Sequence, residues 1–263
     1  MIEILTTDAM GKAYGTGAKR LPIIEGLNLS IRRGEFVSLV GPSGCGKTTL
    51  LMCLAGLLAP SEGQVRFMGQ RVDAPPIGLS VVFQDYSRSL LPWKNNLDNV
   101  LFGMRRVVGL NKAGKRDKAI EILAAVGLKG FEAHYPWQVS GGMQQRVAIA
   151  RGIAAQSELL LLDEPLAAVD AQTRADMQDL LLDLAQRFNQ TCLLVTHDVE
   201  EAVYMADRVL VLGPRPTRVV REVAVNLPKP RDQLVTREAQ EFLHARHEVL
   251  ALIRSMRQGQ VPE

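Results

Sequence analysis

Residues 36–49 read FVSLVGPSGCGKTT, an apolar run that leads into a glycine-rich loop ending in lysine and threonine. Gly41, Gly46, Lys47 and Thr48 match the pattern GxxxxGK[ST], and the match stands between an expected strand at 36–40 and an expected helix from Lys47. Glycines let the backbone curl so that successive N–H groups point at phosphate oxygens. A phosphate-binding loop is therefore expected here, and a glycine-rich turn without a nucleotide is the alternative.

This loop predicts particular contacts. We expect Lys47 to reach the β and γ phosphates and the Thr48 hydroxyl to bind magnesium. The full set of expected nucleotide contacts in the loop is Gly41, Pro42, Ser43, Gly44, Cys45, Gly46, Lys47, Thr48 and Thr49.

A second stretch, LLLLDEP at 159–165, indicates a buried strand that ends on two acids. Ligands collect at the carboxyl ends of strands in parallel sheets, so Asp163 suits the magnesium shell. On an extended chain Glu164 points the other way, and it could accept a proton from an attacking water, a role worth about 10²–10⁴-fold in rate. Two solvated acids that close a strand are the alternative.

Strands that alternate with helices predict an α/β fold with a largely parallel sheet. Strands are expected near 23–31, 36–40, 77–83, 159–162, 191–197 and 208–213, and 64–72 indicates a strand pair. Helices are expected at 47 to about 58, where Pro60 and Gly63 end the first, at about 171–188 and at the terminal segment 238–256. Between Gln84 and Ser157 the pattern becomes helical, which indicates an inserted helical subdomain.

Composition narrows the class of protein. The chain has 263 residues, 47% of them hydrophobic, and a net charge of +3 without a basic block, so nucleic-acid binding is not indicated. The first ten residues carry acids and no base, unlike a secretory signal, and the longest apolar run, at 50–59, is shorter than the roughly 20 residues of a membrane span. Three cysteines without metal-like spacing fit a reducing, cytoplasmic compartment.

Six motifs occur in order: GPSGCGKTT, Gln84 in VVFQD, VSGGMQQRVAIARGIA, LLLLDEP, AAVD at 167–170 and His197 in VTHD. Together they resemble the ATPase subunit of ATP-binding cassette (ABC) transporters over nearly the whole chain. The resemblance implies a P-loop NTPase core with a mixed sheet, N-terminal antiparallel strands and an inserted helical subdomain. It implies one ABC ATPase domain with a RecA-like core at about 1–86 and 158–213, a helical subdomain at about 87–157 and a short tail at 214–263.

The resemblance also implies roles for single residues. Gln84 would sense the metal and the attacking water, so Thr48, Gln84 and Asp163 form the expected Mg²⁺ set. His197 would position the γ-phosphate of ATP; its alternative is a helix-capping or otherwise satisfied histidine. Asp170 would communicate between two nucleotide sites. Tyr14 would stack on adenine, and a strand aromatic in the core is its alternative.

The stretch VSGGM at 139–143 raises a separate question, because it is a second glycine-lined helix start. Ser140, Gly141 and Gly142 precede a helix expected to begin near Met143, and their N–H groups and hydroxyl form an anion site. The resemblance implies that this site closes over the ATP held by a second copy of the chain in a head-to-tail homodimer. Met143 departs from the usual glutamine of LSGGQ, and a simple capped helix is the alternative.

The resemblance implies partners in the membrane. An integral-membrane permease would carry the transport path, with a solute-binding protein acting through it, and the chain would lie peripherally on the cytoplasmic side of the inner membrane. YSRSLLPW at 86–93 is expected in the groove that receives a permease helix, and Leu90, Leu91 and Trp93 are alternatively subdomain core.

FQDYSRSLLPW, followed by LDNVLFGM, resembles the importer branch for nitrate, taurine and aliphatic sulfonates, and the short tail suits that branch. A soluble cassette ATPase without a membrane partner is the competing class. The single cassette, the absence of a long coiled-coil insertion and the missing basic stripe stand against it. An inert nucleotide-binding regulator is a third possibility, and Glu164 argues against that.

Overall fold

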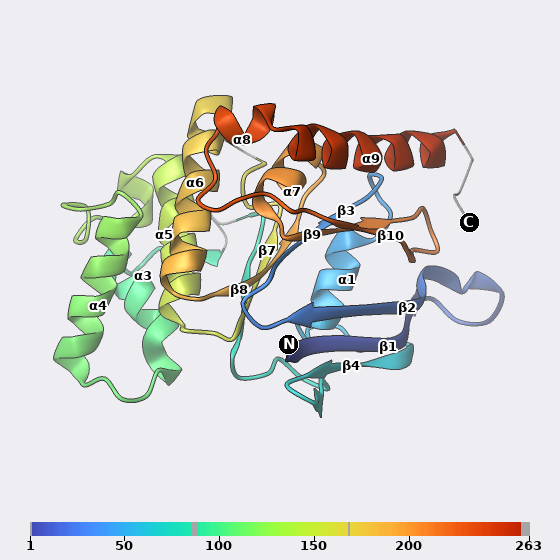
Figure 1. The fold of residues 1–263 in the computed structure, drawn as a ribbon. Helices are drawn as coiled ribbons and strands as arrows, with labels where there is room; N and C mark the ends of the chain where they lie inside the picture. The colour runs from blue at the N-terminus through green and yellow to red at the C-terminus, as the bar shows by residue number, and fades with distance from the viewer. Residues whose placement is uncertain (1, 86–88, 168, 259–263) are drawn as a thin grey trace. The chain divides into compact units, whose positions relative to one another are not determined.

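The computed structural model describes residues 2–85, 89–167 and 169–258 (Figure 1). The chain forms two compact units. The first unit comprises residues 1–76 and 191–263, and the second comprises residues 77–190.

The first unit contains a four-stranded antiparallel sheet in the order β2-β1-β4-β5. In β4, Val65 and Phe67 are buried whereas Arg66 between them is exposed, the alternation of a half-buried strand. The strands are β1 (Glu3–Tyr14), β2 (Leu21–Arg32), β4 (Glu62–Phe67) and β5 (Gln70–Arg71), and a 3₁₀ turn η1 (Gly17–Lys19) joins the first two. The N-terminal antiparallel strands are thus present.

A second sheet of this unit surrounds the strand before the glycine-rich loop. β3 (Phe36–Val40) runs parallel to β8 (Thr191–Val195) on one side and to β9 (Arg208–Leu212) on the other, and β10 (Val219–Ala224) pairs antiparallel with β9, so the sheet is mixed. Every residue of β3, β8 and β9 is buried, as expected for strands covered on both faces.

Helices cover this sheet. α7 (Val199–Met205) and α9 (Gln240–Arg257) pack on each other and on its strands, as Figure 1 shows, whereas α1 (Lys47–Leu54) contacts β8. A short helix, α8 (Val235–Glu238), precedes α9. The predicted terminal helix is therefore present.

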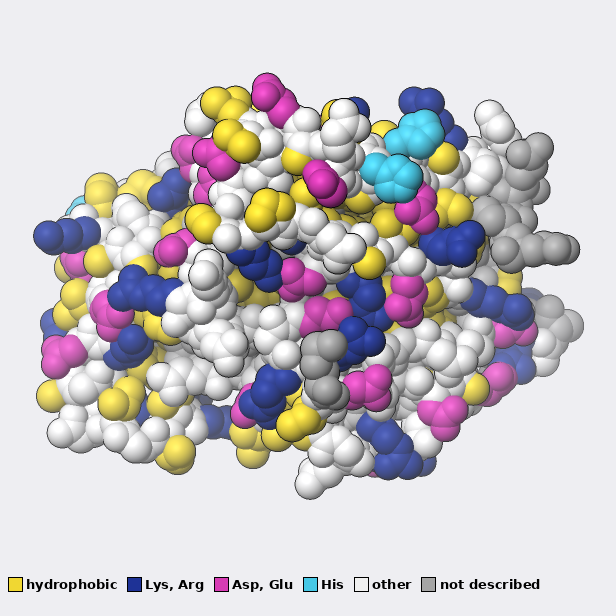
Figure 2. Space-filling model, in the orientation of Figure 1, with side chains coloured by type: hydrophobic (Ala, Val, Ile, Leu, Met, Phe, Trp, Pro, Cys, Tyr) yellow, Lys and Arg dark blue, Asp and Glu magenta, His cyan; other side chains and the backbone are white. Residues whose placement is uncertain are grey.

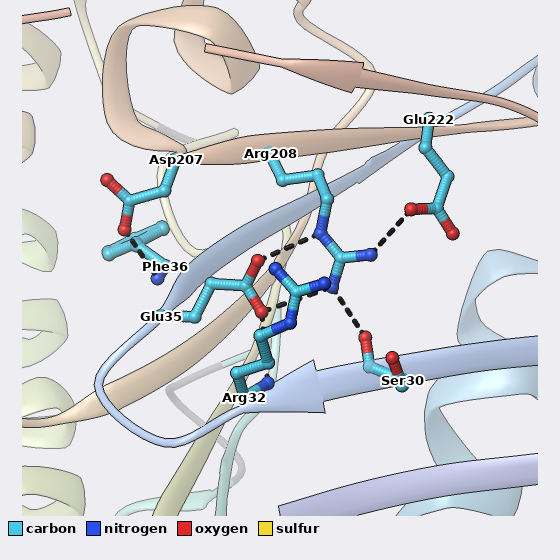
Figure 3. Close-up of polar contacts among 7 residues, drawn as sticks. All are labelled: Ser30, Arg32, Glu35, Phe36, Asp207, Arg208 and Glu222. Carbon is cyan, nitrogen blue, oxygen red and sulfur yellow. Dashed lines mark hydrogen bonds and ion pairs between the residues drawn. The ribbon is translucent and has the colours of Figure 1, made fainter. Parts of the chain in front are cut away.

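An ion network fixes the start of β3 (Figure 3). Arg208 donates to both carboxylate oxygens of Glu35, at 2.8 and 3.1 Å, to Glu222 at 2.6 Å and to the Ser30 carbonyl at 2.6 Å. Beside it the Asp207 carboxylate accepts the N–H of Phe36 at 3.0 Å. Hydrogen bonds to Glu35 and Glu222 raise the pKa of Arg208 against the opposing effect of burial. The turn between β2 and β3 is thereby tied to the β9–β10 hairpin.

The second unit combines a parallel strand pair with helices. β6 (Leu79–Val82) pairs with β7 (Leu159–Asp163). The α-helices are α3 (Asn96–Gly103), α4 (Lys112–Ala125), α5 (Gly141–Ala154) and α6 (Ala171–Arg187), with 3₁₀ turns η2 (Met104–Arg106) and η3 (Pro136–Gln138). At the start of each of these four α-helices, the side chain of the N-cap residue accepts a backbone N–H from the first turn. The N-cap residues are, in chain order, Asn95, Asn111, Ser140 and Asp170.

One predicted boundary is wrong. The first helix ends at Leu54 and not near residue 58, so Pro60 and Gly63 do not end it. Gly56 has a left-handed φ of 69°, and the N–H of Leu57 reaches back to the Met52 carbonyl at 2.9 Å. This is a glycine-dependent helix ending, which stops α1 one turn earlier.

Candidate functional site

The glycine-rich loop joins β3 to α1 in the first unit, as its sequence predicts. Gly44 and Gly46 have left-handed φ values of 73° and 117°, which L side chains rarely adopt. At Gly41 the constraint is space, because an added Cβ would lie 2.9 Å from the Leu212 carbonyl oxygen. The glycines are therefore required by the backbone path of the loop.

Lys47 places its charge inside this loop. The side chain is buried, with 7% of its surface exposed, and its ammonium donates to the carbonyls of Gly41 at 3.1 Å and Pro42 at 3.4 Å. Ser43 is exposed on the same loop, and Thr48 is exposed in the first turn of α1. Burial raises the pKa of the neighbouring Cys45 thiol, so that the thiol stays protonated. The loop thus presents one fixed positive charge together with hydroxyl groups, a set suited to anions.

Tyr14 ends β1 and is 45% exposed, so the interpretation as a core aromatic is wrong. The Lys12 ammonium lies 5.5 Å from the ring centroid and donates to the Ala59 carbonyl at 2.7 Å. The aromatic ring is thus on the surface of the first unit, where a planar group can stack on it.

His197 follows β8 and is exposed. The helix cap belongs to its neighbour: the Asp198 carboxylate accepts the N–H groups of Glu200 at 2.8 Å and Glu201 at 3.1 Å at the start of α7. The capping alternative for His197 is therefore wrong. An Asp followed by Glu two and three residues later was a readable cap signal that the sequence reasoning missed.

The two acids after β7 lie in the second unit. Asp163 is buried at 4% exposure and ends the strand. Glu164 is half-buried with a left-handed φ of 44°, and its carbonyl accepts the Ala167 N–H at 3.2 Å. The premise that Glu164 continues an extended chain is wrong, because the backbone turns there. A non-glycine residue in this conformation is strained, and such strain gathers at functional positions.

Gln84 lies at the same end of the same strand pair. It is exposed at a bend just after β6, and β6 and β7 run parallel with Val82 opposite Leu162. Because parallel strands end at one edge, Gln84 and the two acids follow neighbouring strand ends. The sequence places Gln84, Asp163 and Glu164 at strand ends, and the parallel register of β6 and β7 brings these two ends level with each other.

The VSGGM segment begins α5. The helix starts at Gly141, two residues earlier than expected, so Gly141 and Gly142 are its first residues. The Ser140 hydroxyl accepts the Met143 N–H at 3.3 Å, so the serine caps the helix in this chain. Its hydroxyl proton and the first N–H groups of the helix remain available for an anion.

Asp170 caps α6 through the Thr173 N–H at 3.0 Å, and this bond and others from the backbone lower its pKa. Thr173 also borders the glycine-lined helix start, since a Cβ on Gly142 would lie 3.8 Å from its methyl group. The AAVD motif and the VSGGM motif therefore approach each other within the second unit.

The segment 86–93 is only partly described, since residues 86–88 lie outside the described part of the chain. Leu90 is buried at 3% exposure, which supports the core interpretation for that residue. Trp93 is 72% exposed and does not belong to the core.

A magnesium site would need oxygen donors. Among the described residues, no three or more His, Cys, Asp or Glu side chains come together as a metal-binding group. The residues present still fit Mg²⁺, because it is usually bound by one or two carboxylates together with waters and substrate phosphates. Asp163 and Gln84, at neighbouring strand ends of the second unit, offer a carboxylate and an amide oxygen.

The predicted residues are divided between the units. The phosphate loop, Tyr14 and His197 belong to the first unit, whereas Gln84, Asp163, Glu164 and the VSGGM segment belong to the second. Sequence reasoning missed Thr217. Its hydroxyl donates to the Cys45 carbonyl in the loop, although the two residues are 172 positions apart in the chain.

Comparisons with known proteins agree with this set of motifs. The family model described as "ABC transporter" matches residues 24–167. The ABC transporter ATP-binding protein MJ0412 of Methanocaldococcus jannaschii is 44% identical over 250 residues, 95% of this chain and 91% of that protein. The taurine import ATP-binding protein TauB of Escherichia coli strain K12 is 46% identical over 208 residues, 79% of this chain and 80% of that protein.

The chain is also similar to solved structures of ATP-binding cassettes. A dimeric structure of a post-hydrolysis state of the ATP-binding cassette MJ0796, bound to ADP and Pi, has a TM-score of 0.74 at 31% identity and covers 85% of this chain and 99% of that one. The cbiO1 protein of Clostridium perfringens, part of the ABC transporter complex cbiONQ, has a TM-score of 0.75 at 26% identity and covers 85% and 89% of the two chains. The expected α/β P-loop NTPase fold is confirmed.

In the described part of the chain, no helix combines the length and apolar character that crossing a membrane requires. The phosphate loop with its buried lysine, the family match over more than half of the chain and the close relatives lead to one conclusion. The chain belongs to the ABC transporter family and is an ATP-binding subunit, an ATPase of that family.

Proposed function

We propose that this chain powers an importer for small anions such as taurine, aliphatic sulfonates or nitrate. The observation that carries the proposal is the 46% identity to a taurine import ATP-binding protein over 79% of the chain. Substrate contacts lie in the permease and the solute-binding protein of such a system, so the cassette supplies the energy and not the selectivity.

Each nucleotide contact has a proposed role. Lys47 and the backbone N–H groups that residues 41 and 43–49 carry bind the phosphates, Pro42 shapes the loop beside them, and Tyr14 stacks on adenine. The buried ammonium supports this role, because a charge held inside the loop needs no reorganisation when the phosphates arrive.

The hydrolytic roles fall to Gln84, Glu164 and His197. Glu164 accepts the proton of the attacking water, Gln84 orients that water, and His197 positions the γ-phosphate. Bound Mg²⁺, held by Thr48, Gln84 and Asp163, would neutralise charge on the phosphate oxygens. The alignment of Gln84, Asp163 and Glu164 at neighbouring strand ends supports their acting together.

Two copies of the chain form the working unit in this proposal. Ser140, Gly141 and Gly142 of one copy bind the triphosphate held by the other, and Asp170 links the two sites. The proposal is supported by two dimeric structures of a similar cassette, MJ0796, and by the hydroxyl proton and N–H groups that the helix start offers.

We also propose a division of the chain that follows the pattern of the family. A RecA-like core at about 1–86 and 158–213 binds nucleotide, a helical subdomain at about 87–157 carries VSGGM, and a tail covers 214–263. The subdomain contacts the permease, and a solute-binding protein acts through that permease. The chain then lies on the cytoplasmic side of the membrane as a peripheral subunit.

Figure 2 shows Lys and Arg interspersed with Asp and Glu on one face of the molecule. Such a mixed surface suits protein partners more than a nucleic-acid backbone, which would need a continuous basic patch.

Reconstitution tests this function. The chain is expressed with the permease and solute-binding protein encoded beside its gene, purified from membranes and placed in proteoliposomes. ATP-dependent uptake of labelled taurine, an alkanesulfonate or nitrate is the expected result. Recovery of an active ATPase with no integral-membrane partner would instead favour a soluble cassette, and uptake confined to a sugar or an amino acid would refute the solute class.

A further inference from the structure

A buried threonine in the connection between β9 and β10 contacts the phosphate loop. Thr217 has no exposed surface. Its N–H donates to the Ile23 carbonyl at 2.8 Å, and its carbonyl accepts the Glu25 N–H at 3.2 Å, so its backbone is fixed to β2. Its hydroxyl donates to the carbonyl of Cys45 inside the loop. Thr217 therefore ties the loop both to β2 and to the connection between β9 and β10.

This hydrogen bond determines how one peptide group of the loop is oriented. A trans peptide is planar, and its C=O and N–H point in opposite directions. Because the Cys45 carbonyl points toward Thr217, the N–H of Gly46 points away from it. In the described part of the chain, the Gly46 N–H donates to no backbone carbonyl. It is therefore available to an anion held by the loop.

Packing prevents this peptide from turning over. Gly46 adopts its left-handed φ of 117° against Ile23, where an added Cβ would lie 2.7 Å from the Ile23 methyl group and 3.6 Å from the Thr217 hydroxyl oxygen. Rotation of the peptide would leave the Cys45 carbonyl without its partner in a buried setting, which is unfavourable. The orientation of the Gly46 N–H thus depends on the Thr217 hydroxyl.

We propose that Thr217 is a positioning residue for nucleotide binding, which acts through the Cys45 carbonyl to aim the Gly46 N–H at the phosphates. The inference rests on ATP binding at the phosphate loop. It gives the segment after β9, which carries none of the six motifs, a defined part in the ATPase reaction. Since the phosphates contact the loop before and during hydrolysis, the residue affects KM more than kcat.

Three variants test the proposal. Thr217→Val removes the hydroxyl at nearly constant shape, and Thr217→Ser keeps it. Thr7→Val is the matched control, because the buried Thr7 hydroxyl also donates to a backbone carbonyl, that of Leu27 at 2.9 Å, in the same unit. ADP affinity is measured by calorimetric titration, ATP turnover by phosphate release and folding by thermal denaturation.

We expect Thr217→Val to weaken ADP binding and raise the KM for ATP about tenfold, the effect of losing one hydrogen bond to a charged group. Thr217→Ser should bind ADP like the wild type, and Thr7→Val should lower thermal stability without changing ADP affinity. Wild-type affinity in Thr217→Val, failure of serine to restore binding, or an equal loss of affinity in Thr7→Val would each overturn the proposal.

A second measurement does not depend on the valine variant folding. In ¹⁵N-labelled wild-type protein, titration with ADP should move the Gly46 amide resonance far downfield, because its N–H donates to a phosphate oxygen. ADP binding without such a shift would overturn the orientation argument alone. Failure of the wild type to bind ADP or ATP at all would instead refute the nucleotide-binding function on which the inference rests.

Discussion

Replacing Glu35 with glutamine tests whether the ion network at the start of β3 stabilises the fold. The Glu35 carboxylate receives two hydrogen bonds from Arg208 and one from the Arg32 N–H at 3.0 Å. The side chains of Glu35 and Arg208 are each only 11% exposed. Glutamine removes the negative charge and turns an NH₂ group toward donors. Arg208 would then keep a buried charge but lose its more buried carboxylate partner, the one that accepts two of its hydrogen bonds.

The geometry sets the expected size of the loss. Breaking a buried pair by removing one partner costs about 3–5 kcal/mol. Glu222 still lies 2.6 Å from the guanidinium and the site is not fully dry, so the expected loss is smaller, about 2–3 kcal/mol in the free energy of unfolding. At about 2–4 °C per kcal/mol for a chain of this size, the corresponding decrease in melting temperature is about 4–12 °C.

Two matched variants separate this network from ordinary surface pairs. Glu222→Gln removes a carboxylate that is 47% exposed, and Asp73→Asn removes one that is 74% exposed beside Arg71; each should cost no more than about 1 kcal/mol. Urea denaturation measures all three variants. Losses of equal size in Glu35→Gln and Asp73→Asn would refute the argument that burial makes the Arg208–Glu35 pair strong.

Lys47→Ala should weaken ATP binding by at least about tenfold, because a charge-assisted phosphate contact is lost; wild-type affinity in an equilibrium titration would contradict that contact. Glu164→Gln should keep ATP binding, accumulate the dimer and slow turnover by about 10²–10⁴-fold, and unchanged phosphate release would contradict its role as base. Ser140→Arg should block hydrolysis while the monomer still binds ATP, and a fully active, normally dimerising variant would disprove the cross-subunit contact. Burial raises the pKa of the Cys192 thiol, so maleimide should label it only after unfolding, and rapid labelling of the native protein would show that this part of the core opens.

The elements that sequence patterns predict well are those whose burial is uniform along the chain. β3, β7, β8 and β9 are buried at every position, and each appears in the sequence as an apolar run bounded by turn residues. The phosphate loop could be predicted from the sequence equally well, because its glycines are required by local backbone geometry. Local constraints are visible in a single sequence because neighbouring residues carry them.

The strands and site features that were missed depend on irregular backbone or on distant partners. β1 was not predicted because its pairing with β2 shifts register between Thr7 and Met10, and such an irregularity disrupts the alternation of polar and apolar residues. Glu164 turns where an extended chain was expected, and nothing in the letters LLLLDEP requires a left-handed residue. Asp198 is a helix cap of a readable kind, because an aspartate followed by acids in the first turn is typical of a helix start.

The phosphate loop depends on a hairpin that the chain reaches only about 170 residues later. At the start of β3 the N–H of Phe36 is bonded to Asp207, 171 positions away. In the loop after β3 the Cys45 carbonyl is bonded to Thr217, 172 positions away. Bringing such distant residues together reduces the entropy of the chain between them before the contact stabilises the structure. Such contacts are therefore expected to form late in folding. The GxxxxGK[ST] segment therefore contains the residues of a phosphate site early in folding, but its backbone does not yet have the conformation that binds phosphate. That geometry is complete only when β9, β10 and their connection have packed against β3 and β2.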